Sequence, residues 1–210
     1  MSGMSAIGKR SGIADLLAVF FLPLAANLSA SLLPKLVPGA ETALRFNALC
    51  QGCLLLFAFV RYRQGGSDGA RGKRRFPLFE FAGTLFLYLL LIFLLVRSGY
   101  AASDRNYQTA LRSLGGDSER ATLIFYALCG AAAEEFLFRG ILERGLAVFL
   151  KRRWLTACIA ALLFALYHGN LTQGLLAFPL GLAFSRLKAR GGLRASLAAH
   201  LCINLLALFV

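Results

Sequence analysis

The sequence has few charged residues and few of the side chains that bind metals. Charged residues make up 16% of the 210 residues, and only ten residues are acidic. A soluble domain of this length carries more charge, about a quarter of its residues. Histidine occurs only twice, so a structural zinc site built from cysteines and histidines is not expected. The low charge excludes an ordinary soluble domain.

Hydrophobic residues are abundant instead. They make up 58% of the chain, with 18 phenylalanines, and the mean hydropathy is +0.67. Several apolar runs approach or exceed the roughly 20 residues that are needed to cross about 30 Å of hydrocarbon in a bilayer. The composition therefore predicts an all-α fold, a polytopic bundle of transmembrane helices.

We predict about seven spans, with six to eight possible. They cover approximately residues 13–37, 43–60, 78–96, 121–150, 154–168, 171–187 and 193–210. The first span follows Lys9 and Arg10, as the apolar part of a signal peptide would. Its apolar stretch is longer than the roughly 7 to 15 residues of that part, so we expect the span to be retained.

Basic residues gather between the apolar segments and produce the net charge of +13. The clusters lie at 61–75, 151–153 and 186–194, and even numbers of predicted spans separate them from one another and from the N-terminus. Lys and Arg accumulate in cytoplasmic loops. We therefore expect a cytoplasmic N-terminus and attribute the charge to topology, not to a nucleic-acid partner.

Glu134, Glu135 and Arg139 interrupt an apolar run, AAAEEFLFRGIL. An ionisable residue within a span costs at least about 2.5 kcal/mol on insertion scales, so each one is a functional candidate. Adjacent side chains of an α-helix diverge by about 100°, whereas Glu135 and Arg139 are four residues apart and can pair. Glu134 would then face elsewhere, available as a general base or acid.

Two further motifs place polar side chains one helical turn apart. FALYH contains Phe164 and His168, and HLCIN contains His200 and Asn204. Alone, such a histidine is more often an interfacial or core residue, and such an asparagine often links helices. With an unpaired Glu134 they favour peptide hydrolysis: Glu134 and His168 would activate a water, and His200 and Asn204 would bind the oxyanion.

The three motifs, in this order on three predicted spans, resemble the CPBP intramembrane proteases. This family, also called the CAAX-protease and bacteriocin-processing or Abi family, includes the Rce1-type prenyl-protein endopeptidases. The resemblance covers residues 121–210, which would form the catalytic membrane core. Residues 1–120, with three spans and the basic loop 61–75, carry no motif.

The resemblance implies an intramembrane endopeptidase whose catalytic residues are supported by Glu135, Arg139 and Phe164. Its substrate would be a membrane-anchored protein or peptide, such as one with a C-terminal sorting anchor or a prenylated-type tail. The compact chain fits the prokaryotic branch, so we expect a bacterial inner membrane protein.

Three alternatives remain open at this point. Glu134, His168 and His200 could form a three-ligand zinc set, although Asn204 beside His200 favours a metal-free, glutamate-type mechanism without a cofactor. A non-catalytic membrane scaffold or immunity protein, or a small proton-coupled transporter, could also carry these residues.

Overall fold

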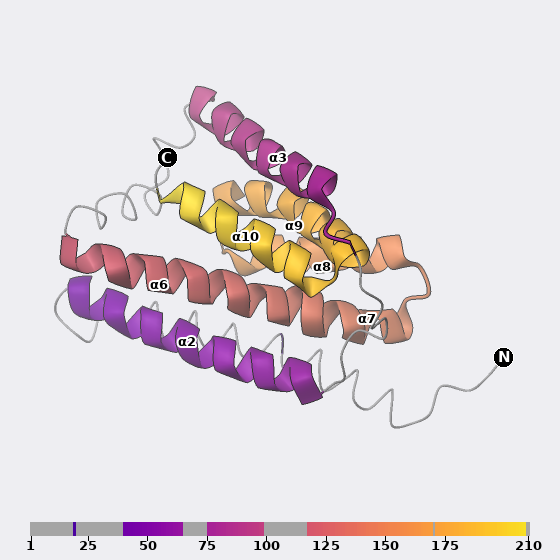
Figure 1. Cartoon of the computed structure of the whole chain (residues 1–210), viewed down its shortest axis with the longest axis horizontal. Helices are drawn as coiled ribbons and strands as arrows, with labels where there is room; N and C mark the ends of the chain where they lie inside the picture. Colours follow the sequence, from indigo (N-terminus) through magenta and orange to yellow (C-terminus); the bar gives the residue numbers. More distant parts are fainter. Residues whose placement is uncertain (1–18, 20–39, 65–74, 99–116, 170, 209–210) are drawn as a thin grey trace.

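The computed structural model describes residues 19, 40–64, 75–98, 117–169 and 171–208. All regular elements in this part of the chain are helical, which confirms the predicted all-α fold (Figure 1). They are α2 (Ala40–Gln64), α3 (Leu78–Arg97), α6 (Asp117–Glu134), the π-helix η1 (Glu135–Leu142), α7 (Glu143–Phe149), α8 (Arg153–Tyr167), α9 (Leu171–Gly191) and α10 (Leu193–Ala207).

Six of the seven predicted apolar segments correspond to these helices, and the segment 13–37 lies outside the described residues apart from Val19. Within the described part, two helices are long and apolar enough to cross a membrane, Leu78–Arg97 and Ala121–Phe149. The helices α8 and α10 are apolar but have only 15 residues each. The count of seven spans therefore stays a prediction.

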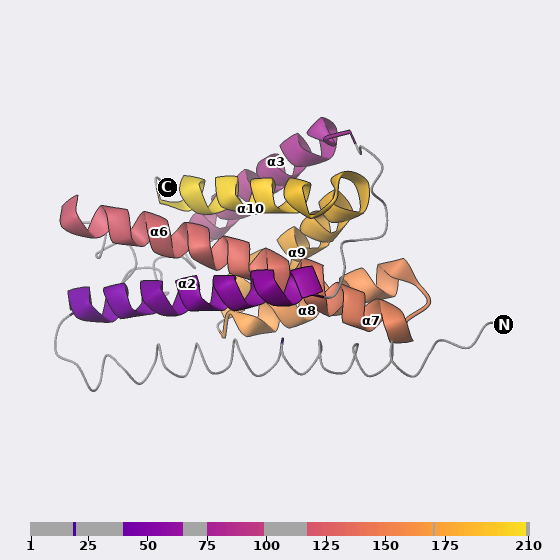
Figure 2. The ribbon, with the colours of Figure 1, turned by 60° about the horizontal axis from the view of Figure 1, so that its bottom comes forward.

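The helix ends gather at two opposite ends of the bundle (Figures 1 and 2). One end holds the end of α2, the start of α3, the α7–α8 turn and the α9–α10 turn. Two contacts tie this end together: Arg144 donates from Nη1 to the carbonyl of Tyr62 at 3.3 Å, and Arg190 forms an ion pair with Glu80 at 3.0 Å. The predicted topology requires the basic clusters to share one side of the bundle, and this arrangement is consistent with it.

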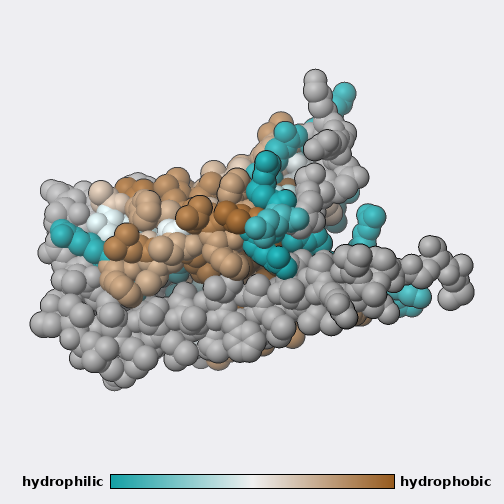
Figure 3. Space-filling model, turned by 90° about the horizontal axis from the view of Figure 1, so that it is seen from below, coloured by the Kyte–Doolittle hydropathy of each residue, from teal (hydrophilic) through white to brown (hydrophobic). Residues whose placement is uncertain are grey.

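The outer surface of the bundle is hydrophobic. Figure 3 shows hydrophobic residues over its middle and hydrophilic residues gathered at one end. Large apolar side chains are exposed along α3, among them Phe79, Phe86 and Phe93. A soluble monomer rarely exposes a large contiguous apolar patch, so a lipid environment explains this surface.

The core is built around η1. Leu137, Ile141 and Leu142 of this helix are fully buried, and they share the core with Phe164 of α8 and Phe184 of α9. Since η1 packs against α2, α8, α9 and α10, this helix, which begins at Glu135, is the most enclosed part of the chain that the structure describes.

The basic segment 186–194 differs from the expected loop. The helix α9 continues to Gly191, and only Gly192, with φ of 78°, separates it from α10. A side chain at Gly191 would place Cβ 2.5 Å from Cδ of Pro77, so this tight turn fits only glycine at that position. As a result, Lys188 lies on a helix and is packed against η1 and α7 instead of projecting from a loop.

Candidate functional site

The predicted site residues come from three places that meet inside the bundle. They are Glu134, Glu135 and Arg139 at the α6–η1 junction, Phe164 and His168 at the end of α8, and His200 and Asn204 on α10.

Both glutamates contact the same imidazole. Nδ1 of His200 lies 3.0 Å from Oε1 of Glu135, and Nε2 lies 3.6 Å from Oε2 of Glu134. A carboxylate only accepts hydrogen bonds, so Nδ1 of His200 is the donor to Glu135. The two side chains therefore converge on one ring, although adjacent side chains of an α-helix diverge by about 100°.

The helix type explains this difference. The α-helix ends at Glu134, and a π-helix, whose bonds connect residues five apart, begins at Glu135. A π-helix is wound less tightly than an α-helix, so adjacent side chains diverge by a smaller angle. Glu134 and Glu135 can therefore both reach His200.

Arg139 is fully buried beside Glu135 at the predicted four-residue spacing. Its Nη1 atom lies 3.6 Å from Oε1 of Glu135, and its Nη2 atom donates to the carbonyl of Gly181 at 3.2 Å. The guanidinium also lies over the rings of Phe164 and Phe184, at 4.3 and 5.2 Å from their centroids. Aromatic faces attract such a cation, and more strongly where water is excluded.

A cavity of about 220 Å³ lies beside His200. His168, His200 and Asn204 all contribute to its wall, together with Phe164. The remaining lining is mostly apolar and comes from α3, α9 and α10: Tyr88, Ile92, Gln173, Leu176, Ala177, Leu180, Phe184, Ile203 and Ala207. Glu134 is linked to this cavity through its contact with His200.

His168 has one ring nitrogen occupied. Its Nδ1 atom lies 2.9 Å from the carbonyl oxygen of Phe164. A carbonyl can only accept, so Nδ1 carries the proton and Nε2 of the neutral ring is an acceptor. Within the described residues, His168 and Glu134 form no ion pair at 4 Å or less. The two side chains predicted to activate a water therefore do not contact each other, and a water would have to lie between them.

Asn204 connects α10 to α6. Its Nδ2 atom donates to the carbonyl of Ala127 at 3.0 Å, which is the helix-linking role common for asparagine in membrane helices. The amide nitrogen carries two hydrogens, so one remains for a group in the cavity that Asn204 also lines.

The described residues do not form a metal-ligand cluster. No group of three His, Cys, Asp or Glu side chains in this part of the chain is arranged to hold a metal ion. Both ring nitrogens of His200 face carboxylate oxygens, and Nδ1 of His168 faces a carbonyl. The alternative zinc set of Glu134, His168 and His200 therefore gains no geometric support, and the absence of a cofactor stays a prediction.

Three polar residues near the site were missed in the sequence. Oγ of Ser185 lies 2.5 Å from Oε1 of Glu143, and Nζ of Lys188 lies 3.2 Å from Oε2 of the same carboxylate. Lys188 also donates to the backbone carbonyl of Arg139. Glu143 falls inside the predicted span 121–150, so the cost of an ionisable residue in a span was the signal that could have found it.

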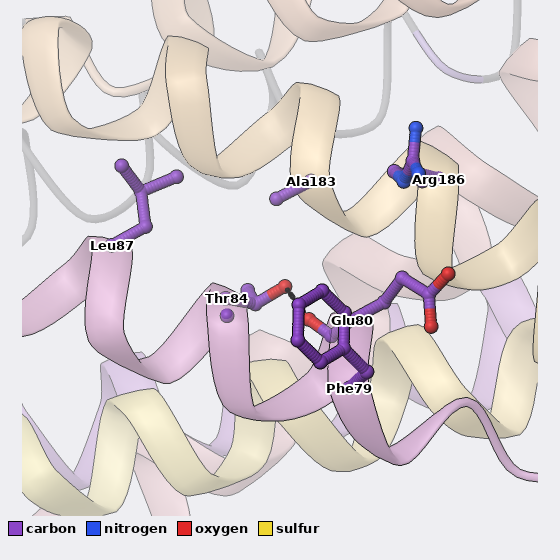
Figure 4. A pocket seen from close by; sticks show the side chains of 7 residues that line it. Phe79, Glu80, Thr84, Leu87, Ala183 and Arg186 are labelled. Carbon is purple, nitrogen blue, oxygen red and sulfur yellow. Dashed lines mark hydrogen bonds between the residues drawn. The ribbon is translucent and has the colours of Figure 1, made fainter.

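A second cavity of about 230 Å³ lies between α3 and α9, away from these residues (Figure 4). Glu80 and Arg186 lie at one end of it, and Leu87 lies at the other. Two of its polar groups have partners nearby: Thr84 donates to the carbonyl of Glu80 at 2.7 Å, and the Glu80 carboxylate pairs with Arg190. This cavity contains none of the predicted site residues.

Comparison with known proteins points to one family. Residues 117–206 match the family model described as Type II CAAX prenyl endopeptidase Rce1-like, and this segment contains all seven predicted site residues. The match confirms the resemblance drawn from the three motifs. No curated protein and no solved structure matches the chain. The family is membrane-embedded, and two helices in the described part of the chain are long and apolar enough to cross a bilayer.

Proposed function

From the match of residues 117–206 to a family of prenyl endopeptidases, we propose that this membrane protein is an intramembrane endopeptidase. It would span the bacterial inner membrane several times and hydrolyse a peptide bond of a membrane-associated protein or peptide. One observation carries the proposal: Glu134 and Glu135 face the two ring nitrogens of His200 beside a cavity that His168 and Asn204 also line.

Glu134 is the proposed general base. It would take a proton from a water as the oxygen of that water attacks the carbonyl carbon, and would later give the proton to the leaving amine. The Nε2 atom of His168 is an acceptor in the tautomer that its bond to Phe164 requires. A water held between Glu134 and Nε2 of His168 would be polarised from both sides.

With protons on both ring nitrogens, His200 is one proposed oxyanion donor, through Nε2–H, and Asn204 is the other. The His200 ring is held at Nδ1 by Glu135 and stacks on Phe184, with centroids 4.7 Å apart and planes at 21°. Asn204 follows His200 by one helical turn on α10, and the amide hydrogen that does not bond to Ala127 would be the second donor. Donors that are fixed before the reaction stabilise the developing charge without reorganising, which is the role that the buried setting of His200 supports.

The cavity suggests the kind of substrate. Its lining is apolar apart from the candidate catalytic residues and a few polar groups such as Gln173, so it suits an apolar segment that arrives from the bilayer. We propose that the substrate is cleaved near such a segment, as a C-terminal sorting anchor or a prenylated-type tail would be.

The test is cleavage by the purified full chain in lipid nanodiscs, with membrane-anchored peptides of both kinds and with products identified by mass spectrometry. Glu134→Gln is expected to lose at least about 100-fold in rate, the typical contribution of a general base. Glu80→Gln, which removes a carboxylate remote from the site, is the matched control. Undiminished cleavage by Glu134→Gln would overturn the proposal.

A further inference from the structure

The π-helix η1 takes from one backbone carbonyl the partner that an α-helix would give it. In an α-helix the carbonyl of Arg139 would accept from the N–H of Glu143, four residues later. That N–H instead bonds to the carbonyl of Phe138. The carbonyl of Arg139 therefore does not receive the bond from Glu143 that an α-helix would give it, and it lies in the most enclosed helix of the described bundle, where backbone polar groups need partners.

A side chain from α9 satisfies this carbonyl. Lys188 donates from Nζ to the Arg139 carbonyl oxygen. The same ammonium group forms an ion pair with Glu143 at 3.2 Å, and the side chains of Lys188 and Glu143 are only 14% and 11% exposed. On insertion scales, such an ionisable residue within a span costs at least about 2.5 kcal/mol. The charged side chain of Lys188 therefore needs partners in a specific geometry.

Ser185 completes this cluster, one helical turn before Lys188. Its Oγ atom lies 2.5 Å from Oε1 of Glu143 and 3.0 Å from the carbonyl of Gly181. The hydroxyl has a single proton, and the charged carboxylate is the stronger acceptor. Ser185 and Lys188 thus bind the two oxygens of Glu143. These bonds fix the Lys188 ammonium group beside η1, where it contacts the Arg139 carbonyl.

The cluster is connected to the candidate site through Arg139 itself. The backbone of Arg139 is held by Lys188, while its guanidinium lies 3.6 Å from Oε1 of Glu135. That oxygen is the acceptor for Nδ1 of His200. If the helical turn at Arg139 moved, Glu135 would move with it, and the ring of His200 would change its orientation.

We propose that Lys188, fixed by Glu143 and Ser185, is a positioning residue for the hydrolysis: it stabilises the π-helical turn that holds Glu135 and His200 in register. This inference rests on the proposed endopeptidase function. The competing explanation is that Lys188 serves only to neutralise the buried Glu143, and a double variant separates the two.

The first measurement is cleavage and unfolding of Lys188→Met, of the double variant Lys188→Met with Glu143→Gln, and of Arg186→Met, an exposed cation on the same helix. Lys188→Met is expected to lower kcat about 10- to 100-fold with little change in KM, as a small misplacement of catalytic groups does. The double variant is expected to regain thermal stability and to keep the low kcat, because Lys188 no longer holds the Arg139 carbonyl. Recovery of kcat together with stability would overturn the proposal.

The second measurement does not depend on cleavage. Because the chain has only two histidines, ¹⁵N-histidine labelling yields two sets of ring-nitrogen resonances, which His168→Gln assigns. Lys188→Met is expected to move the resonances of His200 and to leave those of His168, while Arg186→Met moves neither. Unchanged His200 resonances in Lys188→Met would overturn the positioning role, and a wild-type protein that cleaves no substrate would overturn only the endopeptidase function.

Discussion

Nδ1 of His200 lies 3.0 Å from Oε1 of Glu135, a carboxylate that solvent does not reach. The same oxygen lies 3.6 Å from Nη1 of Arg139. An ionised carboxylate in so enclosed a place is tolerated only with such partners. Glu135 therefore joins η1 to α10, and the orientation of His200 depends on it.

Removing this carboxylate is expected to destabilise the protein. Glu135→Gln leaves Arg139 as a buried charge without its acidic partner, and breaking a buried pair costs about 3–5 kcal/mol in the free energy of unfolding. Denaturant unfolding in micelles can be followed by thiol labelling of Cys129, which is buried on α6. Glu80→Gln, whose partner Arg190 is 58% exposed, should cost at most about 1 kcal/mol. Equal effects of the two substitutions would contradict this account of Glu135.

The sequence predicted the helical fold and the residues that meet at the site, because membrane helices and buried ionisable residues leave strong signals. The apolar segments from residue 43 onwards became helices, and His168, His200 and Asn204 line one cavity. The helices follow from composition, and helical spacing places His200 and Asn204 on one face. The meeting of α8 and α10 was predicted from the chemistry and order of the three motifs.

The contacts of Glu134 and of Lys188 could not be predicted in the same way. The angle between Glu134 and Glu135 depends on a π-helix, whose hydrogen bonds span one residue more than those of an α-helix and which has no periodic signature of its own. Lys188 lies in a run of basic residues that is typical of a cytoplasmic loop, whereas in the structure the helix α9 continues through this run to Gly191.

Gly181 allows α9 to approach α8 and Arg139. A Cβ atom at this position would lie 3.0 Å from Cβ of Ala161 and 3.2 Å from Nη2 of Arg139. Gly181→Ala is expected to lower the free energy of unfolding by about 1–3 kcal/mol, as overpacking of a core does. Gly83→Ala on α3, where a Cβ meets nothing within 4 Å, should be neutral or slightly stabilising because alanine favours the helix. The same thiol-labelling assay measures both, and a larger loss for Gly83→Ala would refute this packing argument.

The predicted orientation can be tested with single cysteines on a background that has no other cysteine. Arg63→Cys and Lys151→Cys lie at the end of the bundle where the basic clusters gather, and Ser98→Cys lies at the opposite end of α3. If the basic end is cytoplasmic, a membrane-impermeant thiol reagent added to intact cells should label only Ser98→Cys. Labelling of the other two and not of Ser98→Cys would reverse the orientation.

Metal removal distinguishes the two proposed forms of catalysis. In the described residues, no three potential ligands are grouped as a metal ion requires. Dialysis against a strong chelator is therefore expected to leave the rate of cleavage unchanged, with less than one metal ion per chain by elemental analysis. Loss of cleavage that added zinc restores would establish the zinc set instead. The control variant Glu80→Gln, which keeps all three proposed ligands, should then respond to the chelator and to zinc as the wild type does.

We expect the substrate to occupy the cavity beside His200, part of whose wall is formed by α3. Ile92 of α3 lines this cavity, whereas Leu89, on the same helix, is 49% exposed and does not line it. Ile92→Trp adds an indole to a space of about 220 Å³, so it is expected to reduce kcat/KM at least about tenfold, equivalent to about 1.4 kcal/mol in transition-state stabilisation. Leu89→Trp, which adds the same bulk on the outer surface, should leave kcat/KM within about twofold, a difference of less than 0.5 kcal/mol. Because both variants keep the candidate catalytic residues, equal kcat/KM values would show that the substrate does not enter this cavity.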